Sequence, residues 1–494
     1  MLSLRVTRQG RVWLLVVLLL LGLGTLGLLL TRAPSVERVL LLSSPLESQG
    51  RDLGAGLASL LADHLEVLAG ATVTHATVLP SPAELARLPA STRILRYQGR
   101  REGDRLLLAV EWTTIARLLA GSQWSPGPAL AREPHRAMDA FVGSWPLKVR
   151  HPYQRTLIPR TPAQFWTLLE GMSIRDDQQA AAHLGVSQRL AEEEPDCTTV
   201  WLTLGDHLYR SLWVNPETAG VGLSSRTHRA FQEAVELVPG HPRATFLWSL
   251  MLTDTGNQNT ALQALTTATS LRRGIPDLYL GLAYAGRTSG LLAGARKALD
   301  RRKELLGALA SPSAWFVETT YLYLGDLASF EQELGRAVAL RQDADILFYQ
   351  GYAALLRGNR KDAIPFLKRG SETAQTPALF RDLCGVYLAY LEGRPKDGLA
   401  QLRAIDVVRG QLRIPDGEWT FKEAEAYALL GEADRAVDCA TRAFVQGFIC
   451  AAWYETSPFL ARVRSHPRWP MLRRNIRERR EVMEGSFPEA VFAP

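Results

Sequence analysis

The sequence predicts a mainly α-helical protein: an α-solenoid of helix pairs, preceded by a small α/β domain and a single transmembrane helix. Three features of the 494-residue chain carry this prediction. They are a long uncharged run near the N-terminus, an alternation of strand and helix patterns over residues 34–150, and a repeat of about 34 residues over residues 160–460. The composition, 47% apolar and 22% charged, excludes a disordered chain, and four cysteines exclude a scaffold built on disulfides.

The uncharged run extends from Val12 to Thr31 and is dominated by leucine. At about 1.5 Å per residue, a helix of this length spans the hydrocarbon core of a bilayer. We therefore predict an uncleaved membrane anchor. A cleavable signal peptide is the alternative. Its apolar region is normally shorter, however, and Arg32 lies next to the expected cleavage site, where small residues are usual.

The charges around this run predict its orientation. Residues 1–11 contain Arg5, Arg8 and Arg11 and no acidic residue, so this short segment is expected in the cytoplasm. The protein would then be a single-pass inner-membrane protein with its later domains in the periplasm. Arg32 and Arg38 lie on the other side of the run. They leave the inverted topology, with the later domains in the cytoplasm, as an alternative.

Residues 34–150 are expected to form a small α/β domain. A short apolar strand at Arg38–Ser43 precedes an amphipathic helix at Asp52–Ala69. A β-branched strand follows at Ala71–Val78. Two further strands, Arg93–Gly99 and Arg105–Trp112, flank a Glu-Gly-Asp sequence that is typical of a hairpin turn.

This order of elements, together with the motif Gly99-Arg-Arg-Glu-Gly-Asp-Arg-Leu, resembles the amino-terminal domain of TolB-like proteins. In that family the domain commonly precedes a tetratricopeptide array. The resemblance implies a non-catalytic interaction module, and it transfers no catalytic residue to this chain.

Residues 160–460 contain the repeat. Trp201-x2-Leu204-Gly205-x2-Leu208 matches the first helix of a tetratricopeptide (TPR) unit, in which bulky positions pack and glycine lets two helices approach. Similar patterns recur around Gly281, Gly351 and Tyr427, and weaker copies bring the total to seven or eight units. Each unit is too small to bury its apolar face alone, so the units are expected to stack.

The chain ends in a basic segment, residues 461–494, for which we predict a capping helix and tail. Just before it, Trp453, Pro458-x-Leu460 and the run His466–Trp469 resemble the terminal motif of TPR arrays that follow TolB-like, cyclase or kinase modules. This second resemblance supports the first from the opposite end of the chain.

Arrays of this kind present their first helices along a concave groove suited to an extended peptide. The register places eight candidate partner-binding residues in that groove: Asp206, Tyr209, Arg210, Phe348, Tyr352, Leu355, Phe421 and Glu425. The lysine and asparagine that family members use to clamp a C-terminal carboxylate are absent from this register. We therefore expect a groove that is apolar in mid-array and binds protein or peptide partners, with Tyr209, Phe348 and Tyr352 as its principal contacts.

No enzyme motif is found in the sequence. Zinc-binding histidine pairs, a phosphate-binding loop and a nucleophile elbow are all missing, so we predict no catalytic residue, no metal ligand and no cofactor. Cys439 and Cys450 lie near each other in the last repeat. They could form a disulfide in an oxidising compartment, although two small buried residues are the more economical interpretation.

The net charge of +7 is concentrated at the two ends of the chain. Residues 1–32 carry +4, residues 460–480 carry +7 and residues 481–494 carry −3, so the body at 33–459 is close to neutral at −1. Nucleic acid is therefore not expected as a partner. The basic C-terminal helix is interpreted as a polar cap, with contact to anionic lipid as the alternative.

These inferences predict a membrane-anchored, non-enzymatic TPR scaffold or sensor for protein partners at a bacterial cell envelope. The alternative is a regulatory subunit of a signalling enzyme, in a cyclase or kinase pathway, with the repeats on the cytoplasmic side.

Overall fold

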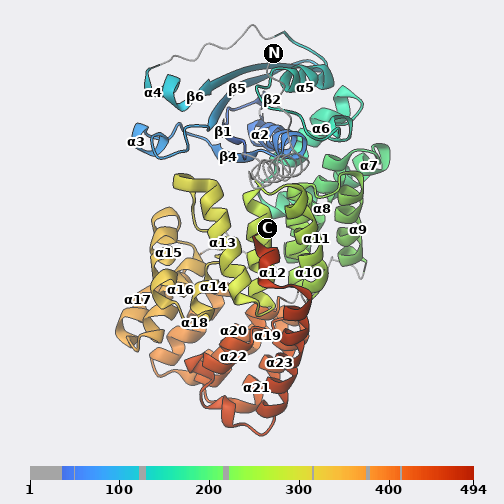
Figure 1. Ribbon diagram of the computed structural model, residues 1–494. Coiled ribbons are helices and arrows are strands. Elements are labelled where there is room, and N and C mark those ends of the chain that lie inside the picture. The colour runs from blue at the N-terminus through green and yellow to red at the C-terminus, as the bar shows by residue number, and fades with distance from the viewer. Residues whose placement is uncertain are drawn as a thin grey trace, which may run out of the picture.

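The structure is a computed structural model that describes residues 36–48, 51–121, 130–214, 222–313, 316–373, 379–411, 414 and 416–493. The predicted anchor Val12–Thr31 lies outside these residues. Within them, none of the helices combines the length and the apolar character that crossing a bilayer requires. The described residues form a small sheet followed by a long array of paired helices, which confirms the prediction of a mainly α-helical array (Figure 1).

The sheet has four strands in the order β4-β1-β5-β6. They are β1 (Arg38–Leu42), β4 (Thr72–Ala76), β5 (Arg93–Glu102) and β6 (Arg105–Thr114). β1 is parallel to both of its neighbours, whereas β5 and β6 form an antiparallel hairpin. The four strands predicted from residue patterns are thus present. Two very short strands, β2 (Glu47–Ser48) and β3 (Arg51–Asp52), pair beside the sheet.

Helix α2 (Gly54–His64) joins the sheet to the helical array. It continues as a π-helical turn at Leu65–Ala69 and ends at Gly70, whose positive φ of 66° suits glycine. Its leucines are fully buried, and it packs against α6 on the side facing the helical array (Figure 1). The other helices before the array are α3 (Pro82–Leu85), α4 (Ile115–Leu119) and α5 (Pro134–Gly143).

Eight helix pairs follow among the described residues. Each consists of a first helix and an antiparallel second helix that packs against it. The pairs are α6 (Pro162–Ser173) with α7 (Asp177–Glu193), α8 (Thr198–Val214) with α9 (Leu223–Leu237), α10 (Pro242–Asp254) with α11 (Gln258–Leu271), α12 (Pro276–Thr288) with α13 (Leu292–Leu306), α14 (Thr319–Tyr323) with α15 (Leu327–Leu340), α16 (Ala344–Leu356) with α17 (Arg360–Ser371), α18 (Leu379–Leu391) with α19 (Pro395–Gln411), and α20 (Gly417–Leu429) with α21 (Ala433–Val445).

Glycine enables both the turn and the close packing within a pair. Gly358, between α16 and α17, has a φ of +76°, a conformation that L-residues with a Cβ rarely adopt. In α8, a Cβ added at Gly205 would lie 2.6 Å from the ring of Phe231 in α9. The TPR-like glycine therefore serves the role the sequence predicts, since it lets two helices of one unit approach.

The array curves until its last pair touches its third and fourth pairs. The backbone N–H of Asp416 donates to the carbonyl of Asp254 at 3.1 Å, and that of Ile449 donates to the carbonyl of Thr288 at 2.8 Å. Figure 1 shows α20 and α22 below α12, in the lower part of the molecule. The repeats thus form a closed superhelix within the described part of the chain.

The C-terminal segment contributes to this closure. It comprises α22 (Ala451–Thr456), a 3-10 turn at Pro458–Leu460 and α23 (Trp469–Ser486). Beyond α23 the chain returns to α12 and α13 (Figure 1). There the ring of Phe492 is fully buried. α23 buries one apolar stripe against the array and exposes most of its arginines.

Candidate functional site

A cavity of about 590 Å³ lies on the concave side of the array, between the first helices of several pairs. We call it the central cavity. Its lining includes Asp206, Trp213, Asp254, Tyr284, Asp416 and Trp419. These residues come from α8, α10, α12 and the start of α20, so the closure of the superhelix is what creates the cavity.

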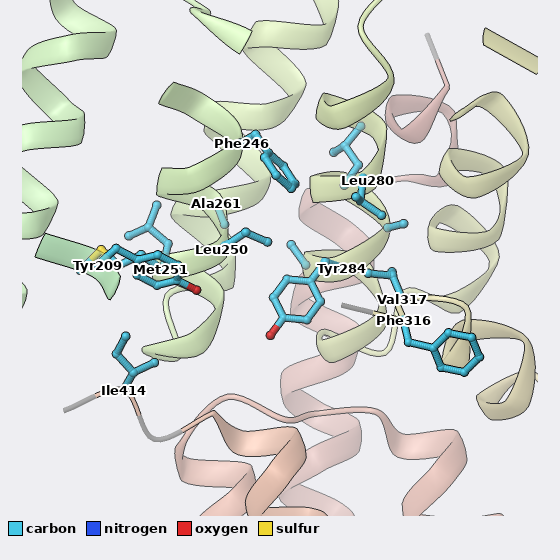
Figure 2. Packing of buried hydrophobic residues seen from close by; sticks show 14 of the residues in the cluster. Tyr209, Phe246, Leu250, Met251, Ala261, Leu280, Tyr284, Phe316, Val317 and Ile414 are labelled. Atoms are coloured by element: carbon cyan, nitrogen blue, oxygen red, sulfur yellow. The ribbon is translucent and has the colours of Figure 1, made fainter. Parts of the chain in front are cut away.

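Asp254, the last residue of α10, is a buried carboxylate of this cavity. It is 3% exposed and accepts hydrogen bonds from the hydroxyl of Tyr209 at 2.6 Å and the hydroxyl of Tyr284 at 2.5 Å. Figure 2 shows these two hydroxyls directed toward each other from α8 and α12. Burial, followed by the nearby charge of Asp416, raises the pKa of Asp254 from 3.8 to about 8.

Asp416 and Glu418 approach from the last helix pair. Asp416 caps α20, since its Oδ1 accepts the N–H of Glu418 at 3.0 Å, and burial raises its pKa to about 6. Glu418 forms an ion pair with Arg287 Nη2 at 2.6 Å and accepts a hydrogen bond from the hydroxyl of Tyr323 at 2.5 Å. One end of the cavity therefore combines several carboxylates with an arginine that is already paired.

The other end of the cavity lies next to α2. There Arg210 donates to Asp206 at 3.1 Å and to the carbonyl of Arg175 at 3.2 Å. Arg243 lies 3.8 Å from Asp206 and 3.9 Å from Asp63 of α2, too far for hydrogen bonds. Charges of both signs are thus balanced at this end.

One wall of the cavity is aromatic. The rings of Trp213 and Trp419 lie 5.4 Å apart, and Phe380 lies 5.3 Å from Trp419. All three side chains are only partly buried. The guanidinium of Arg409 lies 5.8 Å from the centroid of the Trp419 ring. Partly exposed aromatic rings beside carboxylates are suited to contact with a ligand.

Three of the eight predicted partner-binding residues line this cavity: Asp206, Tyr209 and Arg210. They share one face of α8, which is the concave face that the repeat register predicts. Their side chains are held in place by the contacts described above. Asp206 and Tyr209 are 7% and 9% exposed and Arg210 is half-buried, so a partner would meet these side chains only inside the cavity.

The other five predicted residues differ from the expectation of an open groove. Phe348, Tyr352, Phe421 and Glu425 are each fully buried, and Leu355 is half-buried. None of the five lines the central cavity. Phe459 of the C-terminal segment packs against Tyr352, with the two ring centroids 5.0 Å apart.

A polar network holds that segment in the concave face. Glu425 accepts hydrogen bonds from the hydroxyl of Tyr352 at 2.8 Å, from Trp453 Nε1 at 3.0 Å and from Ser457 Oγ at 2.6 Å. Lys422 Nζ lies 3.1 Å from Glu425 and 4.2 Å from the Tyr352 ring. The chain thus fills the second half of its own groove, a long-range contact that the repeat pattern does not reveal.

The possible disulfide between Cys439 and Cys450 is not formed. Cys439 and Cys450 are both free and buried, and burial raises the pKa of each thiol to about 12. This corresponds to the interpretation of two small buried residues. Such thiols are poor nucleophiles because the reactive thiolate is scarcely populated.

Two other groups of reactive side chains occur in the described residues. Asp406, Glu423 and Cys439 have ligand atoms close enough to hold a metal ion, but Arg442 Nη2 lies 2.7 Å from Asp406 and 2.9 Å from Glu423. A guanidinium thus occupies the position a metal would take.

The second group is a pair that the sequence did not suggest. Ser187 Oγ lies 2.8 Å from His207 Nδ1 between α7 and α8. Both residues are at most 3% exposed, and burial lowers the pKa of His207 to about 4. The pair does not line the central cavity.

Comparisons with known proteins identify no family for this chain. No protein-family model matches it, and no curated protein matches it. Among solved structures, one similar chain comes from the crystal structure of the APC/C hetero-tetramer Cut9–Hcn1. It is 12% identical with a TM-score of 0.35, over 73% of this chain and 80% of that chain.

Proposed function

We propose that the protein is a non-catalytic scaffold or sensor that binds a segment of a partner protein in the central cavity. The observation that carries this proposal is the cavity itself, about 590 Å³ on the concave side of the repeats, with charged and aromatic side chains from several pairs. Pockets of this volume with a few convergent polar groups are common ligand sites. Concave faces of helical repeats are extended binding surfaces.

A steric block of the cavity tests the proposal. Leu247 lines the cavity and is only partly buried, so Leu247→Trp adds bulk inside it without removing a polar contact. Leu340→Trp is the matched control, because Leu340 is 65% exposed and is not a lining residue. We expect proteins crosslinked to the full chain in its native membranes to be lost with Leu247→Trp and retained with Leu340→Trp. Equal recovery from the two variants would contradict the proposal.

The proposed setting is the bacterial cell envelope, with Val12–Thr31 as an inner-membrane anchor and the repeats in the periplasm. Its support is the uncharged run and the three arginines before it. Arg32 and Arg38 beyond the run favour the second candidate, a regulatory subunit of a signalling enzyme with cytoplasmic repeats. A reporter fused after Pro494 that is active only outside the cytoplasm supports the first candidate, and one active only inside supports the second.

The sheet is proposed to act as a TolB-like interaction module that holds one end of the array. Its support is the order of the strands together with the docking of α2 against α6. We also propose that the protein is not a catalyst, on the basis of the two reactive groups described above. The guanidinium of Arg442 fills the site formed by Asp406, Glu423 and Cys439. The pair Ser187 and His207 is buried and does not line the cavity.

A further inference from the structure

We propose that the central cavity recognises a cationic side chain, arginine or lysine, carried by an extended segment of the partner protein. This inference rests on the proposed function and adds the chemistry of the partner. It is based on the charged side chains that line the cavity, and on which of them already form an ion pair with another side chain of the lining or its surroundings.

The arginines of the lining are largely engaged. Arg210, Arg243, Arg287 and Arg341 each lie within 4 Å of a carboxylate. Arg287 also donates to the carbonyl of Phe316, and Arg341 also donates to Asp343. Arg175 is the exception and donates to the carbonyl of Ala55.

Three carboxylates of the same lining lack a cation within 4 Å among the described residues: Asp254, Asp277 and Asp416. Asp254 is bonded to tyrosine hydroxyls, and Asp416 to the backbone N–H groups of α20. At the end of the cavity that contains Asp254, Asp416, Glu418 and Arg287, the carboxylates outnumber the arginine, so the potential there becomes negative as Asp254 and Asp416 ionise, which attracts a positive group and repels a carboxylate.

The aromatic wall favours the same ligand. Indole rings attract cations most strongly among the aromatic side chains, and Trp213 and Trp419 are both partly open to the cavity. Trp419 already has Arg409 near its ring. A guanidinium or ammonium between these rings and Asp416 would gain a charge-assisted hydrogen bond and a cation–π contact together.

The dimensions suit a short extended segment rather than a lone ion. Arg243 lies in the first turn of α10 and Asp254 is its last residue. They are therefore about 16 Å apart along the helix, the length of about five extended residues. An arginine within such a segment would reach the carboxylates, while its neighbours would contact Phe246 and Leu247.

Binding of a cation should depend on pH. Asp254 faces Tyr209 of α8, Tyr284 and Arg287 of α12, and Asp416 before α20. Because its pKa is raised to about 8 and that of Asp416 to about 6, both carboxylates are partly protonated near neutral pH. A cationic ligand stabilises their ionised forms, so binding releases protons and the affinity rises between about pH 6 and about pH 8.

The test is calorimetric titration of the purified full chain with capped pentapeptides. The probe is acetyl-Ala-Leu-Arg-Leu-Ala-amide, and the comparison peptide carries citrulline, a neutral isostere, in place of arginine. We expect the arginine peptide to bind at least about tenfold more tightly than the citrulline peptide, as one charge-assisted contact provides. This comparison needs no variant, so its outcome does not depend on the folding of a mutant.

Variants then locate the binding. Asp254→Asn with Asp416→Asn should reduce the preference for arginine over citrulline to about unity, since the charges that select a cation are lost. The matched control is Glu478→Gln with Glu481→Gln, which removes the same charge from the exposed face of α23. Equal affinity of the wild-type chain for both peptides, binding of neither, or an arginine preference that survives the Asp254/Asp416 variant would each overturn the proposal.

The proposal of a cationic ligand and the proposed function can fail separately. If Leu247→Trp abolishes crosslinking of partners while arginine and citrulline peptides behave alike, the cavity binds a partner that is not cationic. If neither experiment shows an effect of the cavity, the proposed function fails as well.

Discussion

Arg287 of α12 and Glu418 of α20 form a buried ion pair, with Nη2 and Oε2 2.6 Å apart, although they belong to the fourth and the eighth helix pairs. Burial alone would lower the pKa of Arg287, but the charge of Glu418 raises it above its usual value. This pair joins the two parts of the array that enclose the central cavity.

Removal of one partner of this pair should be costly. Arg287→Met leaves the Glu418 carboxylate buried without a cation, which costs about 3–5 kcal/mol of unfolding free energy. Combining it with Glu418→Gln should restore part of that loss. Arg477→Met is the control, because Arg477 pairs with Glu455 at the surface, where a pair is worth about 1 kcal/mol or less. Urea unfolding measures the differences, and equal losses at the two sites would contradict the assignment.

Tyr352 should behave as a core residue rather than as a partner contact. Tyr352→Phe removes the hydroxyl that donates to Glu425, at a cost of about 1–3 kcal/mol. Tyr352→Ala also leaves a cavity and should cost about 3–5 kcal/mol. Tyr390→Phe is the control, since Tyr390 is partly exposed and should change little. If Tyr352→Ala leaves the thermal unfolding midpoint unchanged, the conclusion that Tyr352 is buried beneath the C-terminal segment is wrong.

The contrast between Tyr209 and Tyr352 shows how far the sequence could predict the site. Both lie in first helices, and the repeat register puts both on the concave face. The register depends on local spacing, which is also why the helix pairs and the four strands were predictable. Whether a concave face stays open depends on what packs over it, and Phe459 covers Tyr352 from more than a hundred positions away.

For the same reason, Asp254 and Trp419 were not predicted as site residues. The central cavity exists only because the segment before α20 returns to the end of α10. Neither residue belongs to a motif. Hydrophobic periodicity shows which residues share a helix face, but it contains no information on contacts between distant repeats.

Stability should fall as the pH rises above neutrality. Burial raises the pKa of Asp254 to about 8 and that of Asp345 and Glu423 to about 7. In the unfolded chain these carboxyl groups have a pKa near 4, so between pH 4 and the raised pKa values the folded chain binds more protons than the unfolded chain. The stability that these bound protons give the folded chain is present at low pH and is lost as the pH rises through 7 to 8. His207 and His241 act in the opposite direction, but only below about pH 6.5, because burial lowers their pKa values to about 4 and about 3.

The free energy of unfolding is therefore expected to decrease from about pH 6.5 to about pH 8.5, by up to about 1.4 kcal/mol per pH unit for each proton, and the melting temperature should decrease with it. Asp254→Asn should reduce this slope, whereas Glu478→Gln at the surface should preserve it. A slope that is unaffected by Asp254→Asn would show that Asp254 does not titrate in this range.

The four cysteines should resist alkylation in the folded protein. All are free and buried, and burial raises the pKa of Cys197 to about 11 and those of Cys439 and Cys450 to about 12. Iodoacetamide should add no label to the native chain and four labels after denaturation without a reducing agent, as read by intact mass. Only two labels after denaturation would instead indicate a disulfide.

The C-terminal tail should detach when Gly294 gains a side chain. A Cβ at this position would lie 2.5 Å from the ring of Phe492, so Gly294→Ala should expel that ring from its site on α13. Faster carboxypeptidase digestion of the tail would report the change. Gly335→Ala is the control: its Cβ meets nothing within 4 Å, and an alanine inside α15 should stabilise the helix by about 0.5–1 kcal/mol.

The return of Ile449 to Thr288 also affects how the protein folds. In an open solenoid each repeat touches only its neighbours, so repeats can be removed from an end and unfolding can proceed in stages. Here the last pair supports the third and fourth pairs, so a truncation at the C-terminus would expose the middle of the array. We expect the pairs to unfold in a single cooperative transition. Because the closing contacts join distant parts of the chain, a nascent polypeptide can complete the array only after residues near 450 have been synthesised.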